Sequence, residues 1–220
     1  MTPRVLFEQE LEQLHEYIVE MGRQIEKTYS KLFRSIGSKD ENELIQVYKS
    51  DHTLSEMQHK IESSCLKLIT KQQPIARDLR MVTAALKVVT DMQRVGDHCS
   101  DIADLVLRLK MKEMDQFSMH LSAMIIETGS LSKSAVDAFV NRDIEAAREV
   151  IAGDDVVDNL FNLVKDDLIE CLRKNSMDAD ECVDVLMIAK YLEKIGDHAV
   201  NIGEWGIFQE TGNIRDTRLL

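Results

Sequence analysis

The chain has 220 residues, and its 27 Lys and Arg side chains are outnumbered by 39 Asp and Glu, which gives a formal net charge of −12. Such an acidic surface repels nucleic acid and anionic lipid, so we expect neither as a partner. With only 2 prolines, 9 glycines and few aromatic residues, the composition favours long helices over sheet.

The apolar residues are too scattered to span a membrane, because no run of about 18 of them is present. We therefore expect no direct membrane insertion. The four cysteines show no C-x-x-C spacing, which favours small buried hydrophobes in a reducing, cytoplasmic setting over disulfides or a zinc site.

Periodic apolar residues predict six helices along the chain. They are expected near residues 4–36, 41–71, 75–112, 117–140, 144–174 and 178–208. The turns between them are short, with Asp40 placed to cap the second helix and Pro74 placed to end it. Long helices joined by short turns pack as up-and-down bundles.

One stretch of helical sequence occurs twice. MQRVGDHCSDIAD at 92–104 returns as LEKIGDHAVNIGE at 192–204, with the same Gly-Asp-His triplet in both copies. An internal repeat at this distance indicates two copies of one folding unit. We predict an all-α fold of two tandem three-helix bundles related by this repeat, the first over residues 1–112 and the second over 113–220.

Each copy of the repeat carries a column of polar side chains on the helix face opposite its apolar stripe. Positions four apart on a helix differ by only about 40° in direction, so these groups lie one above the other. The columns consist of Glu193, Asp197 and Asn201 in the second copy and Gln93, Asp97 and Asp101 in the first. They are expected to face outward from the bundle core.

The middle helix of each bundle adds an acid to its apolar stripe. Asp154 interrupts the stripe of the second bundle, Asp51 interrupts that of the first, and Asp158 follows Asp154 by one turn. A carboxylate in such a place needs a partner, because burying an unpaired charge is costly. Several oxygen ligands together suit a divalent or ferric cation. Pairing with Lys or Arg across the bundle is the alternative.

The stretch QPIARDLR at 73–80, the Asp-bearing helix before it and the doubled Gly-Asp-His motif together resemble the PhoU family, over about residues 7–208. The resemblance implies two three-helix bundles whose exposed E/D-x-x-x-D motifs bind metal ions, iron or zinc in some members. It also implies a cytoplasmic homodimer that regulates phosphate uptake and the phosphate regulon negatively. Its implied partners are the ATPase subunit of the phosphate ABC transporter and the phosphate sensor histidine kinase.

The family's metal-binding positions carry over where its motifs match. The ligands implied in the second repeat are Glu193, Asp197, Asn201, Asp154 and Asp158, and those in the first are Asp97, Asp101 and Asp51. The first repeat departs from the family, because Gln93 replaces a Glu and Ser55 stands where an acid is usual. Residues 113–220 also carry 22 acidic and 10 basic side chains, whereas residues 1–112 carry 17 of each. We therefore expect the second unit to bind metal more tightly.

Two other functions compete with this one. A ferritin-like di-iron oxidase would use E-x-x-H pairs, and Glu12 with His15 and Glu56 with His59 have that spacing. Glu12 and His15, however, lie off the main apolar stripe, whereas di-iron ligands point inward. A metal-independent adaptor would dock a basic partner on the acidic face. Because acidic columns serve both a metal site and an adaptor, the sequence leaves these two open.

Overall fold

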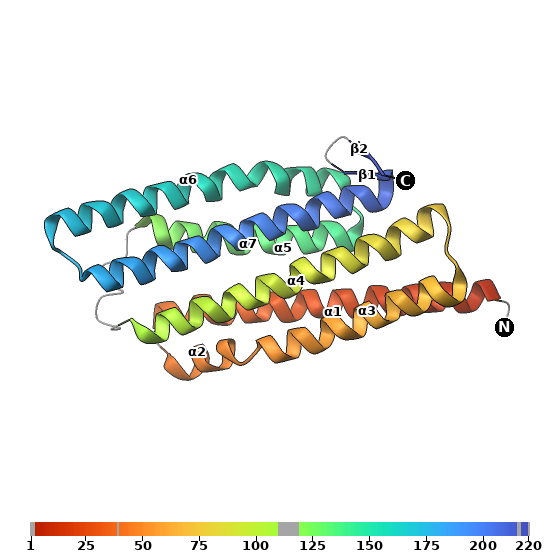
Figure 1. Ribbon diagram of the computed structural model, residues 1–220, viewed down its shortest axis with the longest axis horizontal. Helices are drawn as coiled ribbons and strands as arrows, with labels where there is room; N and C mark the ends of the chain where they lie inside the picture. The colour runs from red at the N-terminus through yellow and green to blue at the C-terminus, as the bar shows by residue number, and fades with distance from the viewer. Residues whose placement is uncertain (1–2, 39, 110–118, 215–216, 220) are drawn as a thin grey trace.

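The computed structural model describes residues 3–38, 40–109, 119–214 and 217–219, and it is almost entirely helical (Figure 1). The elements are α1 (Pro3–Ser38), α2 (Glu41–Tyr48), α3 (Asp51–Gln72), α4 (Ala76–Arg108), α5 (Met119–Asn141), α6 (Ile144–Lys174), α7 (Ala179–Thr211), β1 (Asn213–Ile214) and β2 (Thr217–Arg218). The two short strands form an antiparallel hairpin after the last helix. The predicted all-α class is confirmed.

Each repeat forms one bundle, which confirms the predicted pair of tandem three-helix bundles. The first consists of α1, α4 and the α2–α3 pair, and the second of α5, α6 and α7. The bundles lie side by side, with α4 packed along α7 and α1 against α5 (Figure 1). The predicted boundary at residues 112 and 113 lies outside the described residues.

The apolar stripes become a core that is continuous between the bundles. Fully buried side chains line the middle helices and the repeat helices, for example Leu54, Met92 and Leu192. Cys65 and Cys99 belong to this core as free thiols, and burial raises the pKa of each to about 12. They act as small hydrophobes, as the sequence indicates. Among the described helices, none is long and apolar enough to cross a bilayer.

The glycine of each repeat lies where two helices cross closely. A Cβ built on Gly96 of α4 would come within 2.2 Å of Leu54 Cδ1 on α3. A Cβ on Gly196 of α7 would lie 3.3 Å from Val157 Cγ1 on α6. Both glycines therefore let the middle helix approach the repeat helix, and the crossing is tighter in the first bundle.

The prediction of one helix over residues 41–71 is wrong, because the structure breaks it into α2 and α3. The backbone N–H and Oγ of Ser50 both donate to the carbonyl of Val47, at 3.0 and 2.7 Å. The next carbonyl, that of Tyr48, accepts a 2.7 Å hydrogen bond from Ser100 Oγ on α4. In a continuous helix those carbonyls would accept from residues four places later. The helix therefore stops and restarts at Asp51, whereas α6 runs through the equivalent region unbroken.

Candidate functional site

Four carboxylates of the second bundle meet where α6 crosses α7. We call Asp154, Asp158, Glu193 and Asp197 the second acidic seam. The Asp154 carboxylate lies over Gly196, since a Cβ built on that glycine would be 3.2 Å from Asp154 Oδ1. Burial, together with the charges of the other three seam acids and of Asp155, raises the pKa of Asp154 to about 6. Burial and the charges of Glu193, Asp197 and Asp155 raise the pKa of Asp158 too. The structure thus brings these four predicted residues together.

Two lysines of α7 neutralise part of this charge. Lys190 forms an ion pair with Glu193, and Lys194 pairs with Asp197 while lying 3.5 Å from Glu193 Oε2. The hydrogen bond to Asp197 raises the pKa of Lys194. Sequence reasoning missed both lysines, although their spacing of three residues from the acids is the signal that pairs side chains on a helix.

The first bundle has a smaller version of the same arrangement, which we call the first acidic seam: Asp51, Asp97 and the amide of Gln93. Gln93 Nε2 donates to Asp51 Oδ1 at 3.0 Å and to Asp97 Oδ1 at 2.6 Å, so one neutral side chain bridges two carboxylates. Burial and the neighbouring Asp51 raise the pKa of Asp97 to about 6. Arg94 completes the seam through a 3.1 Å ion pair with Asp97.

The remaining predicted ligand of the first repeat, Asp101, is exposed on the rim of an open cavity of about 650 Å³ that Asp51 and Asp97 also line. His98 Nδ1 is 3.5 Å from its carboxylate. The structure therefore places Asp101 beside the first seam rather than among its hydrogen-bonded groups.

Asn201 is directed at the other bundle. Its amide donates to Asp91 Oδ1 on α4 at 3.2 Å, and His198 Nδ1 lies 2.8 Å from the same oxygen. The His98 and His198 rings stack across the α4–α7 contact with centroids 5.5 Å apart. Asn201 thus contributes to the contact between the bundles in this structure. Sequence reasoning did not identify Asp91, because it lies outside the repeated motif.

The donor chemistry of both seams fits a hard cation, since every seam group offers oxygen. In the part of the chain that the structure describes, however, no three His, Cys, Asp or Glu side chains are placed together as a metal site. In the second seam, Lys190 and Lys194 stand beside the carboxylates that a cation would use. An ion would therefore have to displace these ammonium groups.

The residues of the di-iron alternative lie on the surface. Glu12 and Glu56 are exposed, and 74% of the His59 side chain is accessible. Glu56 lies 3.7 Å from its own neighbour His52. These side chains do not supply the inward-pointing ligands that such an oxidase needs.

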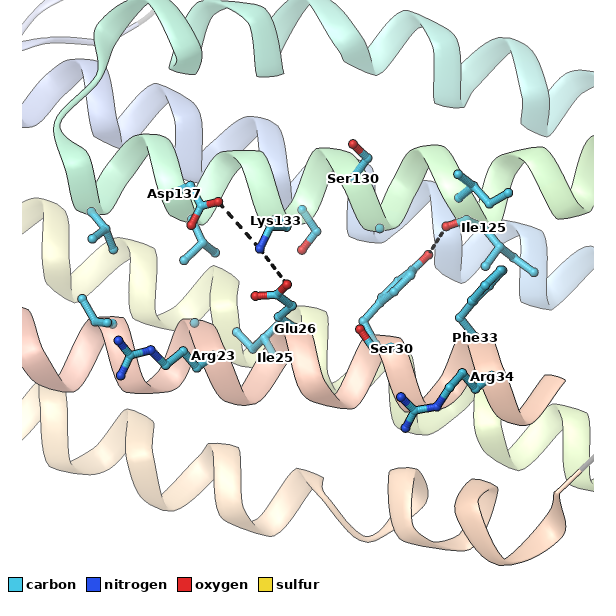
Figure 2. Close-up of a pocket in the computed structure, with 18 of the residues that line it drawn as sticks. Arg23, Ile25, Glu26, Ser30, Phe33, Arg34, Ile125, Ser130, Lys133 and Asp137 are labelled. Atoms are coloured by element: carbon cyan, nitrogen blue, oxygen red, sulfur yellow. Dashed lines mark hydrogen bonds and ion pairs between the residues drawn. The ribbon is translucent and has the colours of Figure 1, made fainter. Parts of the chain in front are cut away.

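A larger cavity, of about 700 Å³, lies between α1 and α5, where the two bundles meet (Figure 2). Its wall is largely apolar, and Tyr29 donates a 2.6 Å hydrogen bond to the Ile125 carbonyl across it. Lys133 Nζ lies 2.6 Å from Glu26 Oε1 and 4.0 Å from Asp137 Oδ2. Figure 2 shows the lysine between these two acids. These three charges are thus paired with one another. None of the predicted metal ligands lines this cavity.

Comparison with known proteins gives one consistent result. The PhoU domain profile matches residues 18–106 and again 121–206. A phosphate-specific transport system accessory protein PhoU homolog from Clostridium acetobutylicum is 34% identical over 210 residues, covering 95% of this chain and 96% of the relative. A homolog of the same description from Thermotoga maritima is 30% identical over 214 residues, covering 96% and 92%.

Solved structures agree. The crystal structure of the phosphate transport system regulatory protein PhoU from Streptococcus pneumoniae superimposes with a TM-score of 0.88 at 26% identity, covering 96% of this chain and all of that one. PhoU from Pseudomonas aeruginosa gives a TM-score of 0.82 at 26% identity, covering 94% of this chain and all of the other. With two matched domains, two bundles and a paired seam of acids at equivalent crossings, the chain belongs to the PhoU family.

Proposed function

We propose that this protein is an accessory regulator of phosphate transport that restrains phosphate uptake and the phosphate regulon. The observation that carries the proposal is the match of both repeats to the PhoU domain, together with relatives named as phosphate-specific transport system accessory proteins. The role needs a docking surface and no bond-making chemistry. The paired acidic seams supply such a surface.

The proposed partners are the ATPase subunit of the phosphate ABC transporter and the phosphate sensor histidine kinase, both in the cytoplasm, with a homodimer as the working form. The acidic second half supports a basic docking partner, because opposite charges speed encounter and select against acidic surfaces. Within that half, the exposed face of α6 carries Asp155 and Asp158.

We also propose that the acidic seams bind divalent or ferric cations, iron or zinc foremost. In the second bundle the ion would be held by the second acidic seam, which is Asp154, Asp158, Glu193 and Asp197. Asn201 would reach the ion only if its amide released Asp91. Asp51, Asp97 and Asp101 would hold one in the first. A bound cation would take over the neutralising role that Lys190 and Lys194 have in the metal-free protein, and so change the charge presented to a partner.

The experiment that tests the regulatory role is deletion of the gene, followed by complementation. In phosphate-replete cells, deletion should raise phosphate uptake and phosphate-regulon expression, and the intact chain should restore repression. Unchanged expression in the deletion strain would exclude the role.

Treatment with a chelator distinguishes the metal-binding adaptor hypothesis from the metal-independent one. In a pull-down with the transporter ATPase subunit, the metal-binding adaptor should lose binding after chelator treatment and recover it on adding iron or zinc. Binding that survives chelation but is lost on charge reversal by Asp197→Lys would favour the metal-independent adaptor.

A further inference from the structure

The packing of α6 against α7 has a defined antiparallel register. A Cβ built on Gly196 of α7 would lie 3.3 Å from Val157 Cγ1 on α6, and one built on Gly203 would lie 3.6 Å from Val150 Cγ1. A step of seven residues along α7 therefore matches a step of seven residues in the opposite direction along α6. Such steps return to the face that a helix turns toward its partner. The facing residues can thus be followed along both helices.

Two such steps toward the α6–α7 turn, the register places two cysteines opposite each other. The first step pairs Ala189 of α7 with Val164 of α6, which are both buried. The second step pairs Cys182 of α7 with Cys171 of α6. Both cysteines are free thiols, and Cys182 is only 2% exposed whereas Cys171 is half-buried. Cys182 belongs to the apolar core, and Cys171 packs against that core.

The short turn between α6 and α7 holds this end of the helix pair together. Each cysteine lies within one helical turn of the connection. On the α6 side the Ser176 N–H donates to the Cys171 carbonyl at 3.1 Å, and on the α7 side the Cys182 N–H donates to the Asp178 carbonyl at 3.0 Å. Burial and a negative charge on Cys171 both raise the pKa of the Cys182 thiol. The two sulfur atoms therefore lie near enough to influence each other, in agreement with the register.

The first repeat shows that the fold does not need thiols at this place. There Gly96 of α4 faces Leu54 of α3, in the same way as the glycine contacts of the second repeat. The same two steps of seven residues lead to Val82 on α4 and Leu68 on α3. Both of these side chains are buried in the core. An ordinary apolar pair thus fills the position in the first repeat, whereas a pair of cysteines fills it in the second.

We propose that Cys171 and Cys182 form an intramolecular disulfide when the protein meets an oxidising small-molecule disulfide, such as oxidised glutathione. Facing positions on closely packed helices suit this bond, because a disulfide needs its two Cα atoms within about 7 Å. The bond would fasten the turn end of the second bundle, where the first bundle has no equivalent. The inference does not depend on the regulatory role proposed above, and each can fail without the other.

The reaction is thiol–disulfide exchange in two steps. Cys171 reacts first because it is the more accessible thiol: its thiolate attacks one sulfur of the small disulfide, breaks that S–S bond and releases one small thiolate. The Cys182 thiol then loses its proton, and its sulfur attacks Cys171 Sγ and releases the second small thiolate. The two protein thiols are oxidised and the small disulfide is reduced, and the two protons pass to the released thiolates.

Treatment of the intact chain with oxidised glutathione, followed by alkylation of free thiols and tryptic mass spectrometry, tests the proposal. Cleavage after Lys and Arg places the two cysteines on separate peptides, residues 166–173 and 175–190. These peptides should appear as one cross-linked species, lighter than their sum by two hydrogen atoms, and dithiothreitol should separate them. Cys65 and Cys99, which are fully buried in the first bundle, should remain thiols in the same sample.

Two variants distinguish the register from simple reactivity. Cys182→Val installs the residue that the first repeat has at the equivalent place, so oxidation should stop at a mixed disulfide between Cys171 and glutathione. Cys171→Ser with Leu172→Cys moves the thiol about 100° around α6, onto an exposed position, and should lose the cross-link. Circular dichroism checks that both variants keep their helical content.

The bond should also raise the midpoint of thermal unfolding by at least about 3 °C, because it closes a loop and constrains the unfolded chain. Dithiothreitol should reverse this rise. The proposal is overturned if Cys171 and Cys182 both remain thiols after oxidation, or if the bond forms only between chains. It is also overturned if the thiol moved to position 172 forms the cross-link as readily as Cys171 does.

Discussion

The two repeats have the same helical plan but differ in charge at equivalent places. At the crossing of the middle and last helices, the first repeat bridges two carboxylates with the neutral amide of Gln93, whereas the second gathers four acids beside Lys190 and Lys194. Each repeat also has a small cavity between its first and middle helices, lined by lysines in the first repeat and by Glu127 and Glu149 in the second.

This difference shows which features the architecture needs and which it leaves free. Both repeats keep an acid on the middle helix, Asp51 or Asp154, and a glycine where the repeat helix crosses it, Gly96 or Gly196. The other charges vary, although the backbone is similar. Charges that vary on a constant scaffold are not needed for the fold, so they are free to form different binding sites in the two repeats.

The largest expected difference between the repeats is steric. Gly96→Ala should destabilise the protein by about 1–3 kcal/mol, because its Cβ would collide with the fully buried Leu54. Gly196→Ala should change stability by less than about 1 kcal/mol, since the helix propensity of Ala offsets the milder contact. Urea unfolding of both variants measures this, and equal losses would show that the two crossings are equally tight.

A single substitution should make the first acidic seam resemble the second. Gln93→Glu replaces the bridging amide by a carboxylate, so the first bundle should bind zinc or ferrous iron about tenfold more tightly, a gain of about 1.4 kcal/mol. The metal-free variant should be less stable at pH 7, because three carboxylates then meet. Competition titration against a chelating dye measures the affinity.

Gln13→Glu adds the same charge on an exposed part of α1 and serves as the control. An equal gain in affinity there would attribute the effect to net charge alone.

The raised pKa of Asp154 predicts a pH dependence of stability. Because its pKa is about 6 in the folded protein against about 4 in the unfolded chain, the native state binds more protons between these values. The free energy of unfolding should therefore fall as pH rises from about 4 to 6. Asp154→Asn should reduce that slope, with Asp97 contributing part of the remainder, and should raise stability at pH 7 by about 1 kcal/mol, since the residue is partly solvated. Chemical unfolding across this pH range measures it in metal-free protein, and an unchanged slope would contradict the assignment.

Much of the fold and part of the site were predictable from the sequence. Helical periodicity and the doubled motif reveal the two bundles, and Asp51 and Asp154 are identified as polar interruptions of apolar stripes. The break at Ser50 was not predictable, because the donor that removes the Tyr48 carbonyl is Ser100 of a different helix. Asn201 was assigned from its column, whereas its contact is with Asp91 across the bundles. Both misses concern partners that lie far apart in the chain.

The core that runs through α4 and α7 has a consequence for how the molecule melts. Since apolar side chains of both bundles are part of one buried cluster, removing either bundle would expose the inner face of the other to water. Heat should then unfold the chain in a single cooperative transition, with calorimetric and van't Hoff enthalpies in agreement. A ligand held by one bundle alone would raise the melting temperature of both.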